Sequence, residues 1–321
     1  MQRVTIQDIA REAGVSASTV SRVFNNNPRI SREVSSRVRE IARKYNYHPR
    51  LPIRQRNVIL LVPQESGYPA HYCVERLVMA LSGELFKRNF QVEIVPWSNR
   101  DNLKNKQFYA AAAIGIDGEI FRNWQDDFVQ TLVLVDRSLE PAEPGVYQVC
   151  ADEYGAMKLA AEHFKSCGIR RPGVLIYGSP GSGNSDLRMA GAMEAMKAAG
   201  FPADAELFHF ASPENFMEKC RILLQEKIDA ILCPGSSGGS LTAYALHQNR
   251  MRIPDDISLI ASEVAFFSPF ATPPQTSVCP DYTAMADAVV DIFIAVLEGK
   301  KVPVRTILPY TLKVRDSVKK S

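Results

Sequence analysis

The chain has 321 residues, of which 46% are hydrophobic and 23% are charged, and its formal net charge is +3. This length has room for a small module and one or two larger lobes with a sizeable core. No apolar run approaches the length of a membrane span, and the amino terminus lacks a cationic-then-apolar signal segment. We therefore expect a cytoplasmic protein with no membrane partner.

The charge is unevenly distributed along the chain. Residues 1–56 contain 12 Lys/Arg and 4 Asp/Glu, a net charge of +8, whereas residues 57–321 contain 26 and 31, a net charge of −5. A cationic segment joined to an acidic body is typical of a module for a polyanion attached to a domain with another task.

The cysteines and histidines give no sign of a metal site or of a catalytic site. Six cysteines are scattered without a Cys-x-x-Cys motif, and no histidine lies near them at metal-ligand spacing. The five histidines form no nucleophile-base arrangement either. We predict reduced thiols, no metal, no cofactor, no catalytic residues and no enzymatic activity. The cysteines are Cys73, Cys150, Cys167, Cys220, Cys233 and Cys279.

Residues 6–13 have the pattern of a short amphipathic helix. Thr5 is a good N-cap, and Gly14 can end the helix because glycine tolerates a left-handed conformation. Ser16 can then cap a second helix after a tight turn. The apolar side chains of the first helix recur at the spacing of one helical face, at Ile6, Ile9, Ala10 and Ala13.

The second helix has one apolar and one polar face. Val20, Val23 and Phe24 form the apolar stripe, and a third helix follows from the candidate N-cap Ser31. The opposite face carries small or hydrogen-bonding side chains suited to phosphates and base edges in a major groove. The alternative is an ordinary helical hairpin whose polar face is merely solvated. The polar face comprises Ala17, Ser18, Thr19, Ser21, Arg22 and Asn25.

Residues 5–25 resemble, position by position, the headpiece of the lactose and galactose repressor family of bacterial transcription regulators. The resemblance rests on Thr5, Asp8, Ala10, residues 13–16, residues 19–23 and Asn25. It implies that Ala17, Ser18 and Arg22 read bases, and Arg22 could grip a guanine. It also implies phosphate contacts by Thr5, Ser16, Thr19, Ser21, Asn25 and Ser31, which position the headpiece without reading sequence.

Residues 48–57 contain two prolines and three arginines and are predicted to be a linker between the headpiece, 1–47, and the body, 58–321. In the family this stretch commonly forms a hinge helix whose leucine wedges into the minor groove. Here Pro52 interrupts the stretch, and Arg56 falls about where that leucine would be. We therefore expect an extended connector whose Arg50, Arg54 and Arg56 contact DNA.

The body alternates strand-like runs with helical patterns, which predicts the α/β class: two doubly wound lobes with parallel sheets. The second lobe is expected to begin after Asp136-Arg137, and a late helix, 285–298, to return to the first. The resemblance, thinner here, implies a periplasmic-binding-protein-like body that forms a dimer. The predicted strands are 58–63, 91–96, 110–116, 131–135, 173–177, 206–210, 230–233 and 257–261, and the helices between them are 74–88, 156–166, 187–199, 216–226 and 241–249.

A ligand of such sheets binds beyond the strand C-termini, so we expect an effector site between the lobes. Arg188 opens a helix where the family uses arginine to hold its effector, although a surface salt bridge is the alternative. Tyr68, His71 and Tyr72 could stack on a ring or serve only packing. Where the family usually has Asn-Asp and a later Asp, this chain has Gly235-Ser236 and Glu263, which puts sugar recognition by paired carboxylates in doubt. Ser236 and Glu263 remain candidates for effector binding, and Glu263 could still supply one carboxylate.

Together these patterns predict a homodimeric regulator, most simply a repressor, that binds roughly palindromic double-stranded operator DNA. Such a protein would be associated with the nucleoid in the cytoplasm. Its partner in the body would be a small polar effector such as a sugar or sugar-like metabolite. The competing interpretation is a two-lobed solute-binding protein or sugar-modifying enzyme with an incidental helical hairpin.

Overall fold

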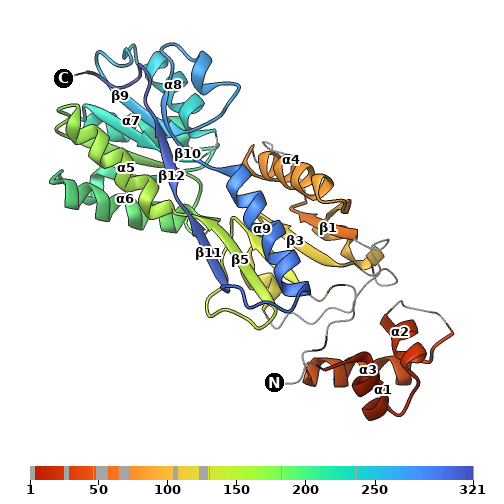
Figure 1. Ribbon diagram of the computed structural model, residues 1–321. Helices are drawn as coiled ribbons and strands as arrows, with labels where there is room; N and C mark the ends of the chain where they lie inside the picture. Colours follow the sequence, from red (N-terminus) through yellow and green to blue (C-terminus); the bar gives the residue numbers. More distant parts are fainter. Residues whose placement is uncertain are drawn as a thin grey trace.

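The computed structural model describes residues 4–24, 29–45, 47, 57–64, 72–103, 108–122, 129, 131–181, 183–235 and 237–320. Three short helices are followed by two α/β lobes, each built on a six-stranded sheet (Figure 1). This arrangement confirms the predicted fold class. Within the described residues, no helix is long and apolar enough to cross a membrane.

The three N-terminal helices share one small core. They are α1 (Ile6–Ala13), α2 (Ala17–Phe24) and α3 (Arg32–Lys44). The Phe24 ring packs at a tilt against Tyr47, with ring centroids 6.1 Å apart. Apolar side chains from all three helices close the core, namely Ile9, Ala10, Ala13, Val20, Val23, Phe24, Val38 and Ala42.

The first lobe has a fully parallel sheet in the order β11-β5-β4-β3-β1-β2. Its strands are β1 (Asn57–Val62), β2 (Gln91–Pro96), β3 (Ala110–Ile114), β4 (Leu132–Val135), β5 (Val146–Ala151) and β11 (Arg305–Leu308). Helices α4 (Tyr72–Lys87) and α9 (Tyr282–Leu297) cover one face. The 3-10 helices η2 (Trp97–Leu103) and η3 (Gly118–Phe121) cover the other. Side chains alternate between the two faces of a strand. Val58 and Leu60 therefore pack against α4 and α9, whereas Ile59 and Leu61 pack on the face covered by η2 and η3.

The second lobe has the sheet order β12-β10-β9-β8-β6-β7, and β12 runs antiparallel to β10 at one edge. Its strands are β6 (Pro172–Tyr177), β7 (Phe208–Ala211), β8 (Ala230–Cys233), β9 (Ser258–Ser262), β10 (Thr276–Pro280) and β12 (Tyr310–Lys313). Its helices are α5 (Glu153–Ser166), α6 (Ser185–Ala199), α7 (Phe216–Gln225) and α8 (Gly238–Gln248), with the short 3-10 helices η4 (Ala205–Leu207) and η5 (Ser268–Phe270).

The chain passes between the lobes three times: from β5 to α5, from β10 to α9, and from β11 to β12. As expected, α9 returns to the first lobe, where it lies beside α4 although the two helices are far apart in sequence (Figure 1). The expected start of the second lobe after Asp136-Arg137 is wrong, because β5 still belongs to the first sheet. Gln148 of β5 is 1% exposed, and its side-chain amide hydrogen-bonds to the backbone N–H and carbonyl of Leu139. This polar residue interrupts the apolar pattern from which a buried strand is predicted.

Candidate functional site

Polar side chains fix the turn between α1 and α2. Thr5 and Asp8 form a capping box, in which the Asp8 N–H donates to Thr5 Oγ1 and the Thr5 N–H donates to Asp8 Oδ2. Gly14 ends α1 at φ 65°, in the left-handed region that favours glycine. The Thr19 N–H donates to Ser16 Oγ at 3.0 Å. The sequence therefore places Thr5, Gly14 and Ser16 correctly at the helix ends.

The outward face of α2 is the candidate nucleic-acid interface. Val20 and Val23 are buried, whereas Ser18 and Arg22 are exposed one helical turn apart. Among the described residues, Arg22 has no ion-pair partner. Its guanidinium is thus available for a base edge or a phosphate.

The other predicted contact residues form a polar surface around the start of α2. Ser16 Oγ lies 2.8 Å from Ser18 Oγ and 2.8 Å from Thr19 Oγ1, so these three hydroxyls are hydrogen-bonded to one another. Ser31 caps α3 by accepting from the Val34 N–H at 3.3 Å. Ala17 and Ser21 are half-buried beside them. The remaining predicted DNA contacts lie outside the described residues: Asn25, Arg50, Arg54 and Arg56.

Between the lobes, Arg188 forms a bidentate ion pair with Glu153. Arg188 Nε and Nη2 donate to Glu153 Oε2 and Oε1, each at 2.9 Å. The Arg188 and Glu153 side chains are 19% and 3% exposed, so this is an internal pair rather than the surface salt bridge considered from the sequence. Burial opposes the charged form of Arg188, but Glu153 overcomes this effect and raises the pKa of Arg188. The Tyr310 hydroxyl also donates to Glu153 Oε1, at 3.1 Å.

Asn184 joins this pair to the first lobe. It stands at the N-cap of α6, yet its side chain does not cap that helix. Instead, Asn184 Nδ2 donates to Glu153 Oε1 at 3.0 Å and to Asp136 Oδ1 at 3.2 Å, and Asp136 follows β4 of the first lobe. This amide therefore bridges carboxyl groups from the two lobes.

Asp136 and Arg137 complete what we call the inter-lobe cluster: Asp136, Arg137, Glu153, Asn184, Arg188 and Tyr310. Arg137 Nη1 donates to Asp136 Oδ2 at 2.9 Å. Burial raises the pKa of the Asp136 carboxyl, and the adjacent Arg137 opposes that rise. Arg137 lies against Gly183, where an added Cβ would stand 2.8 Å from Arg137 Nη2. Gly183 has φ +53°, a left-handed conformation that favours glycine. The absence of a side chain therefore allows both this backbone conformation and the close approach of Arg137.

Tyr72 makes a second contact between the lobes. Its hydroxyl accepts from the Ala265 N–H at 2.9 Å, and its ring packs edge-on against Phe266 and against Tyr282. Tyr72 thus contacts Ala265 and Phe266 of the loop after β9. Of the predicted effector residues, Tyr72 and Arg188 both lie at contacts between strand ends of the two lobes. Tyr68, His71 and Ser236 lie outside the described residues.

Glu263, the remaining candidate for effector binding, is committed to the second lobe itself. Its oxygens accept from both terminal nitrogens of Arg315 at 2.8 Å, from Lys313 at 3.2 Å and from the Ser277 hydroxyl. These four bonds use the acceptor sites of a carboxylate. We therefore assign Glu263 a structural role rather than effector binding, because it links the end of β9 to β10, to β12 and to the chain after β12.

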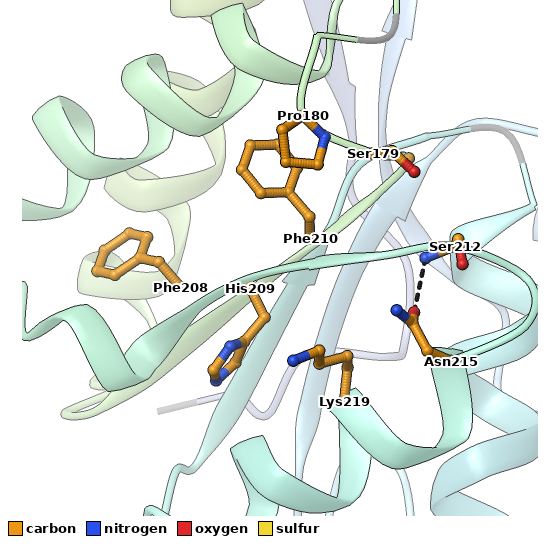
Figure 2. Close-up of a pocket in the computed structure, with 9 residues that line it drawn as sticks. Ser179, Pro180, Phe208, His209, Phe210, Ser212, Asn215 and Lys219 are labelled. Atoms are coloured by element: carbon orange, nitrogen blue, oxygen red, sulfur yellow. Dashed lines mark hydrogen bonds between the residues drawn. The ribbon is translucent and has the colours of Figure 1, made fainter.

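A separate hollow of about 370 Å³ borders the edge strand β7 (Figure 2). Phe210 lies beside Pro180, whereas His209 lies on the other side of the strand, near Lys219. Burial lowers the pKa of His209, and its Nε2 has no hydrogen-bond partner in the described part of the chain. The hollow involves second-lobe residues only, so it is distinct from the inter-lobe cluster.

Several residues of the cluster were not recognised from the sequence. Asp136 and Arg137 were singled out only as the expected boundary of the second lobe, and Glu153, Asn184 and Tyr310 gave no signal. These residues lie at the ends of strands or at the starts of helices and strands, where only the topology brings them together. No group of His, Cys, Asp or Glu in the described residues could hold a metal ion.

Two family models match the chain. Residues 5–50 match the bacterial regulatory proteins of the lacI family, and residues 161–318 match the periplasmic binding protein-like domain. The first match covers the headpiece helices, and the second covers most of the second lobe and the returning segments.

Curated relatives align along almost the whole chain. The sucrose operon repressor of Streptococcus mutans is 25% identical, with 98% of this chain and 99% of the relative covered. The regulator GalR of Escherichia coli is 26% identical, with coverages of 98% and 95%.

Solved structures share the fold over the same extent. A complex of the transcriptional regulator CelR with cellobiose has a TM-score of 0.71 at 23% identity, with 98% of this chain and 100% of that chain covered. The lac repressor dimer bound to operator and an anti-inducer has a TM-score of 0.70 at 21% identity, with coverages of 99% and 100%. The headpiece geometry, the two family models and these relatives agree: the chain has a DNA-binding headpiece of the lacI family of bacterial regulatory proteins and a periplasmic binding protein-like domain, and its relatives are regulators of the same type.

Proposed function

We propose that this protein is a transcription regulator, acting as a repressor, that binds a roughly palindromic operator as a homodimer. The observation that carries the proposal is the headpiece, where α2 presents Ser18 and Arg22 outward within a segment that matches the lacI family. The net charge of +8 on residues 1–56 supports a polyanionic partner. Because that partner is chromosomal DNA, the cytoplasm is the compartment in which the protein would act.

The body is proposed to bind a small polar effector between its lobes. One relative is a sucrose operon repressor, and one solved structure with the same fold is a complex of a regulator with cellobiose. Both support a sugar or sugar-like metabolite as the effector. Three chain crossings join the lobes, and in this proposal one lobe would move against the other about them. An effector that prefers one lobe arrangement would shift the dimer toward or away from the headpiece spacing that the operator requires.

Within this proposal Arg188 would contact the effector from the second lobe and Tyr72 from the first. Arg188 already carries Glu153 on one edge of its guanidinium, so it would reach a ligand while held in place by a buried carboxylate. Arg22, with Ala17 and Ser18, would read bases, and the neighbouring hydroxyls would hold phosphates.

A gel-shift assay on genomic fragments, repeated at several salt concentrations, tests this function. We expect specific retardation of fragments with a roughly palindromic site, with affinity that falls steeply as salt rises. A solute-binding protein or sugar-modifying enzyme with an incidental hairpin predicts no specific retardation at any salt concentration. The relatives are transcription regulators, which also argues against that alternative.

A further inference from the structure

The hydrogen-bond capacity of the inter-lobe cluster is unbalanced. Its carboxyl oxygens are largely occupied: Glu153 Oε1 accepts from three groups, Glu153 Oε2 from one, and each Asp136 oxygen from one. Glu263 already accepts four hydrogen bonds elsewhere. Glu153 and Glu263 thus already accept four hydrogen bonds each, and of these three carboxyl groups only Asp136 keeps open acceptor sites for the hydroxyl protons of a ligand.

The donors, in contrast, are only half used. Glu153 occupies the Nε and Nη2 edge of Arg188, and Arg188 Nη1 donates to none of the described residues. Arg137 uses Nη1 for Asp136, while its Nε and Nη2 donate to none of them. Each guanidinium thus keeps one edge with two parallel N–H directions, the arrangement that matches a carboxylate or phosphate.

The two arginines that carry the free edges come from opposite lobes, and both interact electrostatically with Asp136. A chain of contacts joins them, from Arg137 through Asp136, Asn184 and Glu153 to Arg188. The Arg137 and Arg188 side chains are each 19% exposed, so neither is buried beyond the reach of a ligand at the lobe contact. Gly183 lies against Arg137, and any side chain at position 183 would collide with Nη2, since an added Cβ would stand 2.8 Å from it.

The groups around the two arginines add little negative charge. Burial raises the pKa of Asp136 and raises that of the nearby Cys73 thiol to about 12. Burial likewise raises the pKa of the Tyr282 and Tyr310 hydroxyls, so these neighbours from α4, α9 and β12 stay neutral. The two carboxyl groups of the cluster are each paired with one guanidinium group, Asp136 with that of Arg137 and Glu153 with that of Arg188.

We propose that the effector carries a carboxylate or phosphate group, which Arg137 of the first lobe and Arg188 of the second hold together through their free edges. This inference rests on the proposed effector site between the lobes and narrows its ligand class from any polar metabolite to an acidic one. An oxyanion bound to both arginines favours the arrangement in which the lobes are close, so the same contact supplies the conformational bias.

The first test titrates the full-length protein with inorganic phosphate against chloride at equal ionic strength, with binding followed by calorimetry and by the shift in Tm. We expect saturable binding, weakened about tenfold in Arg137→Gln, because a hydrogen bond to a charged group is lost. Arg221→Gln, an exposed change on α7 outside the cluster, is the matched control and should bind like the parent protein. Phosphate binding to the headpiece would be the same in all three proteins, so the Arg137-dependent part is specific to the cluster.

Arg188→Lys provides a second variant, because Arg188→Gln would leave Glu153 buried without a partner. Lysine keeps the charge but loses the second edge, so phosphate affinity should fall as in Arg137→Gln. Binding that is absent in the parent protein, or equal in the parent protein and both cluster variants, would overturn the proposal.

A second test compares glucose with glucuronate and with glucose 6-phosphate, which separates neutral, carboxylate and phosphate ligands on one ring. Stronger stabilisation by either acid, lost in Arg137→Gln, supports the proposal and identifies the preferred anion. Tighter binding of glucose, unaffected by Arg137→Gln, contradicts it. A neutral ligand that releases operator DNA would leave the proposed function intact and refute only the acidic effector, whereas absence of specific DNA binding would refute the function itself.

Discussion

Arg188 and Glu153 are 35 residues apart in sequence, and both edge nitrogens of the arginine donate to both oxygens of the carboxylate at 2.9 Å. Glu153 starts α5 immediately after the first chain crossing, and Arg188 lies in the first turn of α6. The pair therefore fixes the start of both helices, which pack closely against each other. A residue considered for ligand binding also has a structural partner, and its substitution affects both roles.

We expect Arg188→Ala to lower the free energy of unfolding by about 3 to 5 kcal/mol, because it leaves the Glu153 carboxylate buried without its cation. Urea denaturation of the effector-free protein measures this effect. The matched double variant Arg188→Met with Glu153→Gln removes both charges and should recover most of the loss. A cost below about 1 kcal/mol for Arg188→Ala would mean that water reaches Glu153 and that the pair contributes no more than a surface ion pair.

Glu263 makes stability dependent on pH in the acidic range. Although burial opposes its charged form, the bonds from Arg315, Ser277 and Lys313 lower the pKa of Glu263 from 4.5 to about 2. Because the folded-state pKa is depressed, this stabilisation is present above the unfolded-state pKa and is lost as the pH falls from about 4.5 to 2. We expect it to be roughly 2 kcal/mol after allowance for solvent screening.

The measurement is the difference in free energy of unfolding between the parent protein and Glu263→Gln at pH values from 6 down to 3. The difference should be largest near pH 6 and should shrink as the pH falls. A Glu226→Gln control removes a partly exposed carboxylate on the same lobe, and the Glu263→Gln series is compared with it. A constant difference for Glu263→Gln would show that Glu263 has an ordinary pKa in the folded protein.

Local patterns predict the parts of this fold that local chemistry determines. The caps at Thr5 and Ser16 and the apolar runs of β1 and β8 follow from neighbouring residues, and the structure has them where they are expected. Strand β10 was not predicted, because Thr276 and Ser277 give it a polar appearance. Both residues are buried, and they are satisfied by partners about 40 residues later, such as the Ser317 hydroxyl that accepts from the Thr276 N–H.

The inter-lobe cluster shows the same limit. Arg188 could be singled out as an arginine at a helix start, but its carboxylate partner depends on how α5 and α6 pack. Asn184 looks like an ordinary N-cap in the sequence, and only the structure shows its amide turned toward Asp136. A sequence pattern can identify a functional residue type, whereas its partners come from tertiary contacts.

The linker, 48–57, is predicted from sequence alone to be an extended connector rather than a hinge helix, and residues 48–56 lie outside the described residues. Proline within a helix costs roughly 3 kcal/mol, so Pro52 disfavours a regular helix on the operator. Arginines would then contact phosphates or a narrow minor groove with little wedge-type kinking. Circular-permutation bending assays should show weak central bending. A strong kink that is lost in Leu51→Ala, but kept when Arg54 and Arg56 are changed, would show that a leucine wedge operates.

Arg22 is predicted to read a base, because it is exposed on α2 and has no ion-pair partner among the described residues. Arg22→Ala should cost about 1 to 3 kcal/mol of binding free energy at the cognate operator and relax specificity at one base position. Binding to a set of operators that differ at single positions measures both effects. Arg22 lies one turn after Ser18, so the relaxed position should lie within the half-site that the start of α2 contacts. If Arg22→Ala instead weakened every operator equally and reduced the salt dependence, the guanidinium would be a phosphate contact, and base recognition would fall to Ala17 and Ser18.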